Sequence, residues 1–137
     1  MPHPFKLRPA IRFMVKTYVK GSKFERDLIH FLNYKGFAVA RVPSSGGFLS
    51  PLDIIAIKKG LVIAIECKAW DKLPKLDKKQ LLHFREWVSK AGAIGFVAWK
   101  KPGNVWLFLR LEDAESNRYD EDNWIPMENV LNALDFR

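Results

Sequence analysis

The stretch that decides the fold covers residues 52–68 and reads LDIIAIKKGLVIAIECK. Two apolar runs rich in isoleucine and valine are separated by Lys59-Gly60, a pattern that predicts a β-hairpin. If these two residues alone form the turn, Lys58 lies opposite Leu61, and this pair sets the register of the whole hairpin.

Charged residues stand at the open end of this hairpin, on strands that otherwise read as buried. The predicted register places Asp53 opposite Glu66, with Lys68 two residues further along on the same face. Directly opposed like charges destabilise a sheet, because their Cβ atoms lie only about 4.5–5.5 Å apart. A divalent cation between the two carboxylates would remove this repulsion. One extra residue in the turn would instead put Asp53 diagonal to Glu66.

Length and composition indicate one domain, over residues 21–137, after a basic N-terminal arm over residues 1–20. The chain has 137 residues, of which 48% are hydrophobic and 28% charged, which is enough to bury a core. Its single cysteine, Cys67, excludes an internal disulfide framework and favours a reducing compartment. The sequence has no apolar run of about 18 residues and no apolar signal core, so we expect a cytoplasmic protein without a membrane span.

The net charge of +8 is distributed unevenly along the chain. Residues 1–50 contribute +7 and residues 51–100 contribute +5, whereas residues 101–137 contribute −4. A basic N-terminal two-thirds is typical of proteins that bind a phosphate backbone and release its counterions. The alternative is that these lysines and arginines only form a solvated surface.

The remaining elements follow from apolar spacing and from the positions of glycine and proline. They predict an α/β fold with a mixed five-stranded sheet and helices on both sides, in the order α-β-β-β-α-β-β-α. Besides the hairpin, the expected elements are a helix capped by Ser22 and ended by Gly36, a strand 37–42, a Gly/Ser-rich loop 43–51, a helix capped by Asp77 and ended by Gly92, strands 93–99 and 105–111, and a helix 126–134.

Phosphodiester hydrolysis needs the residue types that gather at the open end of the hairpin. A metal polarises the phosphate, stabilises the leaving oxygen and makes a bound water more nucleophilic. Carboxylate oxygens such as those of Asp53 and Glu66 suit Mg²⁺, and Lys68 would position or help deprotonate the attacking water. Each residue alone has a structural explanation, as a strand-entry residue or an ion pair; the three together favour a metal site. Glu25 fits a capping box equally well.

Residues 51–68 are similar to the PD-(D/E)xK nuclease core through Pro51, Asp53, Glu66, Cys67 and Lys68, although Leu52 and not proline directly precedes the aspartate. Over about residues 20–111 the chain more fully resembles the archaeal Holliday junction resolvases. The matching residues are Gly21, Glu25-Arg26, Gly36-Phe37-Ala38-Val39, Arg41, Ser44-Ser45-Gly46, Asp53-Ile54-Ile55-Ala56, Glu66-Cys67-Lys68, Gln80 and Lys100-Lys101-Pro102-Gly103.

This resemblance implies a restriction-endonuclease-like fold and a Mg²⁺-dependent endonuclease, with Mn²⁺ as a substitute, of DNA recombination and repair. It implies a symmetric homodimer that places paired nicks in four-way junction DNA, with no small-molecule substrate and no membrane partner. The implied residues are Glu25, Asp53 and Glu66 as acidic site residues, Lys68 as the catalytic lysine, the Cys67 carbonyl as a main-chain ligand, Lys23, Arg26 and Arg41 as phosphate contacts, and Ser44 or Ser45 on a DNA-engaging loop.

Several assignments stay open at this stage. Gln80 is a candidate site residue but fits a capping role equally well. Trp99, Trp106 and Phe108 lie on the last two strands, where they indicate either core packing or an exposed dimer interface. The alternative functions are a restriction or repair nuclease that cuts duplex or flap DNA, and a DNA-binding protein without activity. The three histidines have no ligand spacing, so a zinc site is not expected.

Overall fold

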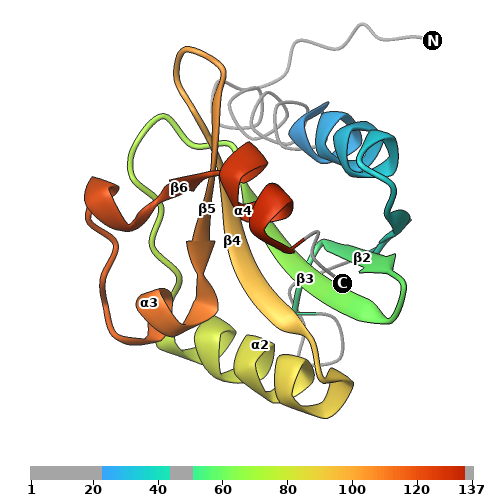
Figure 1. Ribbon diagram of the computed structural model, residues 1–137. Coiled ribbons are helices and arrows are strands. Elements are labelled where there is room, and N and C mark those ends of the chain that lie inside the picture. The colour runs from blue at the N-terminus through green and yellow to red at the C-terminus, as the bar shows by residue number, and fades with distance from the viewer. Residues whose placement is uncertain (1–22, 44–50, 135–137) are drawn as a thin grey trace, which may run out of the picture.

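The computed structural model describes residues 23–43 and 51–134 of the chain. They form an α/β fold in which one mixed sheet is covered by helices on both faces, as the sequence predicts (Figure 1). After a first helix over residues 23–34, the elements are β1 (Ala38–Arg41), β2 (Ile54–Lys58), β3 (Leu61–Lys68), α2 (Lys78–Ala91), β4 (Ile94–Lys101), β5 (Val105–Arg110), α3 (Leu111–Glu115), η1 (Glu121–Asn123), β6 (Ile125–Pro126) and α4 (Met127–Leu134).

The described sheet has six strands in the order β1-β2-β3-β4-β5-β6, not the five that the sequence predicts. Only β3 and β4 run parallel, and α2 supplies the crossover connection that parallel neighbours require. The additional strand, β6, has two residues and pairs antiparallel with β5. Two residues are too few to show an alternating pattern, which is why the sequence does not reveal this strand.

The predicted register of the β2–β3 hairpin is confirmed. Lys58 pairs with Leu61, so Lys59 and Gly60 alone form the turn. Both turn residues have positive φ, 49° and 87°, as a type I′ turn requires; this turn matches the twist of the flanking strands. Beyond the last ladder pair, Ile54–Ile65, the Asp53 N–H donates to the Ile65 carbonyl at 2.9 Å, so the regular register ends there. The predicted direct pairing of Asp53 with Glu66 is therefore not part of the ladder, although both residues lie at the same end of the hairpin.

The second predicted helix, α2, begins and ends where its capping residues indicate. Asp77 caps it by accepting a hydrogen bond from the Gln80 N–H at 2.7 Å. Gly92 ends it in the left-handed conformation, with its N–H bonded to the Val88 carbonyl. The cap therefore fixes where the first turn of α2 begins, and Gln80 lies in this turn.

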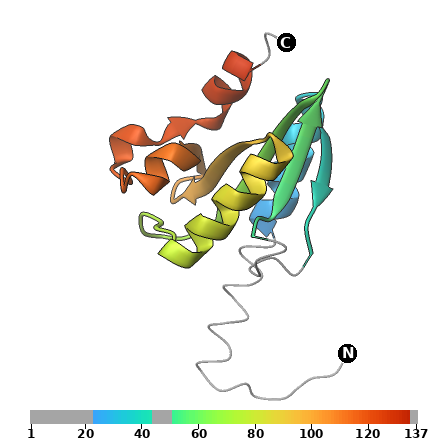
Figure 2. The same ribbon diagram turned by 90° about the horizontal axis from the view of Figure 1, so that it is seen from below.

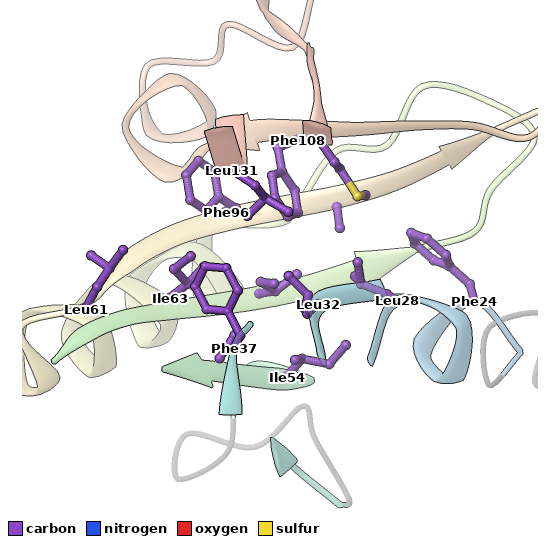
Figure 3. Packing of buried hydrophobic residues seen from close by; sticks show 14 of the residues in the cluster. Phe24, Leu28, Leu32, Phe37, Ile54, Leu61, Ile63, Phe96, Phe108 and Leu131 are labelled. Atoms are coloured by element: carbon purple, nitrogen blue, oxygen red, sulfur yellow. The ribbon is translucent and has the colours of Figure 1, made fainter. Parts of the chain in front are cut away.

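Two separate hydrophobic cores hold the helices against the sheet. The first helix and α4 cover one face (Figure 3), whereas α2 and α3 cover the other (Figure 2). The first core includes Phe24, Leu28, Leu32, Ile63, Ile65, Phe96, Phe108 and Leu131, and the second includes Ala64, Phe84, Val88, Val97, Trp99, Leu109 and Leu111. Alternate residues of β3 therefore serve opposite cores, which places Glu66 and Lys68 on the α2 face.

Two further expectations are corrected by the structure. The acidic segment between β5 and α4, for which the sequence predicts no element, contains α3 and η1. One side of α3 is buried through Leu111 and Ala114. The carboxylate of Asp113 is also buried, and it forms an ion pair with Arg110, whose Nε donates to Asp113 Oδ2 at 3.0 Å. Trp99 and Phe108 are buried in the cores, so they do not form an exposed dimer surface.

Trp106 is partly buried and lies edge-on to two phenylalanines of the first helix, with ring centroids 5.4 Å from Phe24 and 5.7 Å from Phe31. The aromatic-rich last strands are thus explained by core packing over the part of the chain that the structure describes. The predicted N-terminal arm 1–20, the Ser22 cap and most of the loop 43–51 lie outside that part. No helix among residues 23–43 and 51–134 is long and apolar enough to cross a membrane.

The hairpin turn can be tested by substituting its two residues, because both have positive φ, which glycine adopts easily and lysine does not. Gly60→Ala should lower the free energy of unfolding by about 1–2 kcal/mol, because a Cβ is strained at φ 87°. Lys59→Asn should keep or slightly raise it, because asparagine tolerates the left-handed region. Urea unfolding of both variants measures the difference. Equal effects of the two substitutions would contradict the assigned turn.

Candidate active site

The two carboxylates of the hairpin are buried at its open end. Asp53 precedes β2 and is 7% exposed, and Glu66 lies near the end of β3 and is 6% exposed. Asp53 Oδ2 accepts a hydrogen bond from the Cys67 N–H at 2.8 Å. This N–H lies beyond the last β2–β3 ladder pair, so the aspartate side chain replaces a strand carbonyl and is fixed by the backbone of β3.

The Asp53–Glu66 pair has the electrostatics of a site built for a cation. The pKa of Glu66 is raised to about 9, first by burial and then by the hydrogen bond and the charge of Asp53. The nearby Lys68 lowers this pKa but does not offset the other effects. Without a cation, the pair therefore keeps a proton at neutral pH, because two carboxylates so close cannot both ionise.

The contacts of Glu66 are concentrated on one of its two oxygens. Gln80 Nε2 donates a hydrogen bond to Oε2, and Lys68 Nζ lies 3.6 Å from the same atom. No described residue donates a hydrogen bond to Oε1, although this atom is buried. A buried oxygen without a donor is costly unless it binds a ligand that the protein alone does not supply. Oε1 thus fits a metal ligand.

Glu25 reaches the site from the first helix but is held by a different partner. Arg41 Nε donates to Glu25 Oε1 at 3.1 Å, linking the first helix to β1. The pKa of Glu25 is raised, first by burial and then by the charge of Asp53, and Arg41 lowers it. Among the described residues no three acidic, histidine or cysteine side chains are arranged to hold a metal ion. Glu25 therefore lies beside the pair and not in a ready-made triad.

Lys68 projects from the same face of β3 as Glu66, as the sequence predicts. Its Nζ lies 4.8 Å from the centroid of the Trp70 ring, a cation–π contact. Trp70 is not among the site residues that the sequence predicts. The only sign of this contact in the sequence is an aromatic residue two positions after the lysine, and this spacing alone does not predict that the two side chains touch.

Gln80, for which capping and a site role were both open, takes part in the site. Its backbone N–H bonds to the cap residue Asp77, whereas its side chain reaches Glu66. The capping-box explanation of its side chain is therefore wrong, because the amide is used on the neighbouring strand. The N-terminal turn of α2 thus brings a polar group to the α2 face of the sheet.

Cys67 has different surroundings for its main chain and its thiol. Its N–H is used by Asp53, and the side chain packs against the first core. Burial and the nearby carboxylates raise the pKa of the thiol, so it stays protonated and unreactive. The role of its carbonyl as a metal ligand stays a prediction.

Three of the predicted phosphate contacts lie near one another in the chain and are exposed. Lys23 and Arg26 are on the first helix, where Lys23 pairs with Asp27 at 2.9 Å, and Arg41 is on β1. All three belong to the elements joined by the Glu25–Arg41 ion pair. Ser44 and Ser45 lie outside the described residues.

Comparison with known proteins identifies the family of this site. Residues 16–136 match the family described as "Archaeal holliday junction resolvase (hjc)". The chain belongs to this family. It is 34% identical over 123 residues to the crossover junction endodeoxyribonuclease Hje of Saccharolobus solfataricus, an alignment that covers 85% of this chain and 90% of the relative. It is also 34% identical to the Hjc of Sulfolobus acidocaldarius, with 85% and 83% covered.

The solved structures agree with this assignment to the resolvase family. The fold is similar to that of the Holliday junction resolvase Hjc of Archaeoglobus fulgidus, with a TM-score of 0.68 and 28% identity, covering 81% of this chain and 99% of the other. The resemblance that the sequence analysis described is thus confirmed, and the fold class with it. The family consists of nucleases that need a divalent metal, and two buried carboxylates fit that need.

The raised pKa of Glu66 predicts how stability depends on pH when no metal is bound. An unfolded chain loses this proton near the ordinary value of 4.5, whereas the folded protein keeps it to about 9. Folding then takes up a proton between these values, so stability falls as pH rises from about 5 to 9. In EDTA, Glu66→Gln should be more stable than the original protein at pH 8.5 by on the order of 2–4 kcal/mol.

Urea unfolding at pH 5.5 and pH 8.5 in EDTA measures this effect. The matched control is Glu86→Gln on the exposed side of α2, where the carboxylate pairs with Lys90 at 3.1 Å. This control should keep the pH dependence of the original protein. If Glu66→Gln keeps it as well, the assigned protonation of the pair is wrong.

Proposed function

We propose that this chain is an endodeoxyribonuclease that resolves four-way DNA junctions by Mg²⁺-dependent hydrolysis of phosphodiester bonds. The observation that carries this proposal is the buried Asp53–Glu66 pair with Lys68 on the same face. The relatives named crossover junction endodeoxyribonucleases support the substrate, since they are similar over most of both chains.

The oxygens of Asp53 and Glu66, with the Cys67 carbonyl, would hold the metal. These are hard ligands that suit Mg²⁺, which keeps several waters of its own. When bound, the ion polarises the phosphate, stabilises the leaving oxygen and lowers the pKa of a water. Glu66 must release its proton before both carboxylates can act as ligands, so metal binding at this site displaces a proton.

The remaining residues orient the reacting groups. Lys68 places a positive charge beside the carboxylates, where its ammonium can hydrogen-bond the attacking water and stabilise charge that develops on the phosphate. Gln80 holds Glu66 Oε2 and so fixes the orientation of the carboxylate. Glu25 adds a third negative charge near Asp53, balanced by Arg41.

The surface around the site suits a DNA backbone. Lys23, Arg26 and Arg41 would contact phosphates, and Ser44 or Ser45 would reach the strand that is cut. Contacts of this kind recognise junction shape and not base sequence. A homodimer with two sites related by two-fold symmetry matches a substrate that receives two opposed nicks. The cytoplasmic location also stays a prediction.

Replacing Asp53 tests the metal site directly. Asp53→Asn removes a charged ligand but keeps an acceptor for the Cys67 N–H, so the fold should persist. Junction cleavage in Mg²⁺ should fall by about 10²–10⁴-fold, while junction affinity changes little. Single-turnover cleavage and gel-shift titration measure the two quantities. Asp122→Asn, on the exposed η1 turn, is the control and should keep full activity. Retained cleavage by Asp53→Asn would exclude this residue as a ligand.

A substrate panel separates this proposal from its rivals. The protein is incubated with a four-way junction, a duplex and a flap of matched sequence, each with Mg²⁺ and with EDTA. We expect paired nicks in the junction in Mg²⁺ and no cleavage in EDTA. Equal cleavage of duplex and junction would favour a restriction or repair nuclease, and binding without cleavage would favour a non-catalytic DNA-binding protein.

A further inference from the structure

An aromatic side chain beside the catalytic lysine has no role in either core. Trp70 follows β3 on the connection to α2 and is 40% exposed, although tryptophan is among the largest apolar side chains. Its ring centroid lies 4.8 Å from Lys68 Nζ, within the distance at which a ring face attracts an ammonium group. The exposed indole is therefore in contact with Lys68, which shares a face with Glu66.

The main chain of Trp70 is anchored, even though it lies outside regular secondary structure. Its carbonyl accepts a hydrogen bond from Trp99 Nε1 at 2.8 Å. Trp99 is 2% exposed and packs edge-on against Trp124, with ring centroids 5.3 Å apart. The main chain from which the Trp70 side chain extends is thus anchored to the second core through the buried indole of Trp99.

Lys68 needs such a support because its other contact is weak. Its Nζ is 3.6 Å from Glu66 Oε2, longer than an ordinary hydrogen bond from nitrogen to oxygen. A lysine side chain has many rotamers, and ordering it costs entropy that one long ion pair does not offset. Without a second contact, the ammonium group could close on Glu66 and compete with a cation for the carboxylate.

We propose that Trp70 is a positioning residue that holds the Lys68 ammonium over its ring face, ready to orient the attacking water. This inference rests on the proposed function through the role of Lys68. It differs from a direct contact of Trp70 with DNA, in which the indole would stack on a base and contribute to affinity.

The contact itself can be tested without any activity. In ¹H–¹³C NMR spectra, the ε-methylene protons of Lys68 should be shifted upfield by the ring current of Trp70, with the resonance assigned by its loss in Lys68→Met. The shift should persist in Trp70→Phe and vanish in Trp70→Leu. Unshifted protons in the original protein would overturn the proposed contact, whatever substrate the protein cuts.

The functional consequence is tested by the same two variants in single-turnover cleavage of a four-way junction with Mg²⁺. Trp70→Leu keeps apolar bulk but removes the ring, and the rate should fall about tenfold. Trp70→Phe should keep the rate within about threefold. Leu73→Ala, an exposed residue of the same connection, is the matched control and should cleave at the original rate.

Junction affinity distinguishes positioning from DNA stacking. In the Asp53→Asn background, which prevents cleavage, Trp70→Leu should change the dissociation constant of the junction less than about twofold. A large loss of affinity would overturn the proposal in favour of stacking, and an unchanged cleavage rate in Trp70→Leu would also overturn it. If the original protein cuts no junction, the proposed function fails, whereas the NMR result still decides the contact.

Discussion

The structure of the candidate site depends on two carboxylates that are buried at one end of a hairpin. Asp53 and Glu66 lie at the same end of the hairpin because the Lys59-Gly60 turn sets the ladder up to the Ile54–Ile65 pair. Both residues are nearly inaccessible to water. This arrangement is unfavourable for the protein alone, as the raised pKa of Glu66 shows. A divalent cation between the two carboxylates would remove this repulsion, because its charge is opposite to theirs.

The two cores explain how the fold supports this arrangement. β3 lies between the hairpin partner β2 and the parallel strand β4, so alternate residues of β3 point into different cores. Cys67 faces the first helix, whereas Glu66 and Lys68 face α2. The Asp77 cap then fixes the turn of α2 from which Gln80 reaches the sheet. The strand β3 is thus packed against the first helix through Cys67 and is contacted by α2 through Glu66.

Much of this site follows from the sequence because its geometry is local. A two-residue turn determines the pairing of strands that are adjacent in the chain, so the ladder that brings Asp53 and Glu66 to the same end of the hairpin needs no tertiary information. The helix α2 is equally local, since Asp77 and Gly92 mark its ends. By contrast, the two-residue strand β6 and the short helix α3 depend on tertiary contacts. The strand pairs with β5, and α3 packs into the second core.

The contacts between layers could not be predicted for the same reason. Gln80 has a local explanation at the start of a helix, and only the packing of α2 on the sheet sends its amide to Glu66. Trp70 has no periodic signal at all, because it lies in an irregular connection. Both residues contact charged groups of β3, Gln80 at Glu66 and Trp70 at Lys68. These contacts arise only when the chain is folded, because the partners belong to different elements. The charged residues of this site can therefore be predicted from the sequence. The neighbouring groups that contact them can be identified only from the packing of the helix and the connecting segment on the sheet.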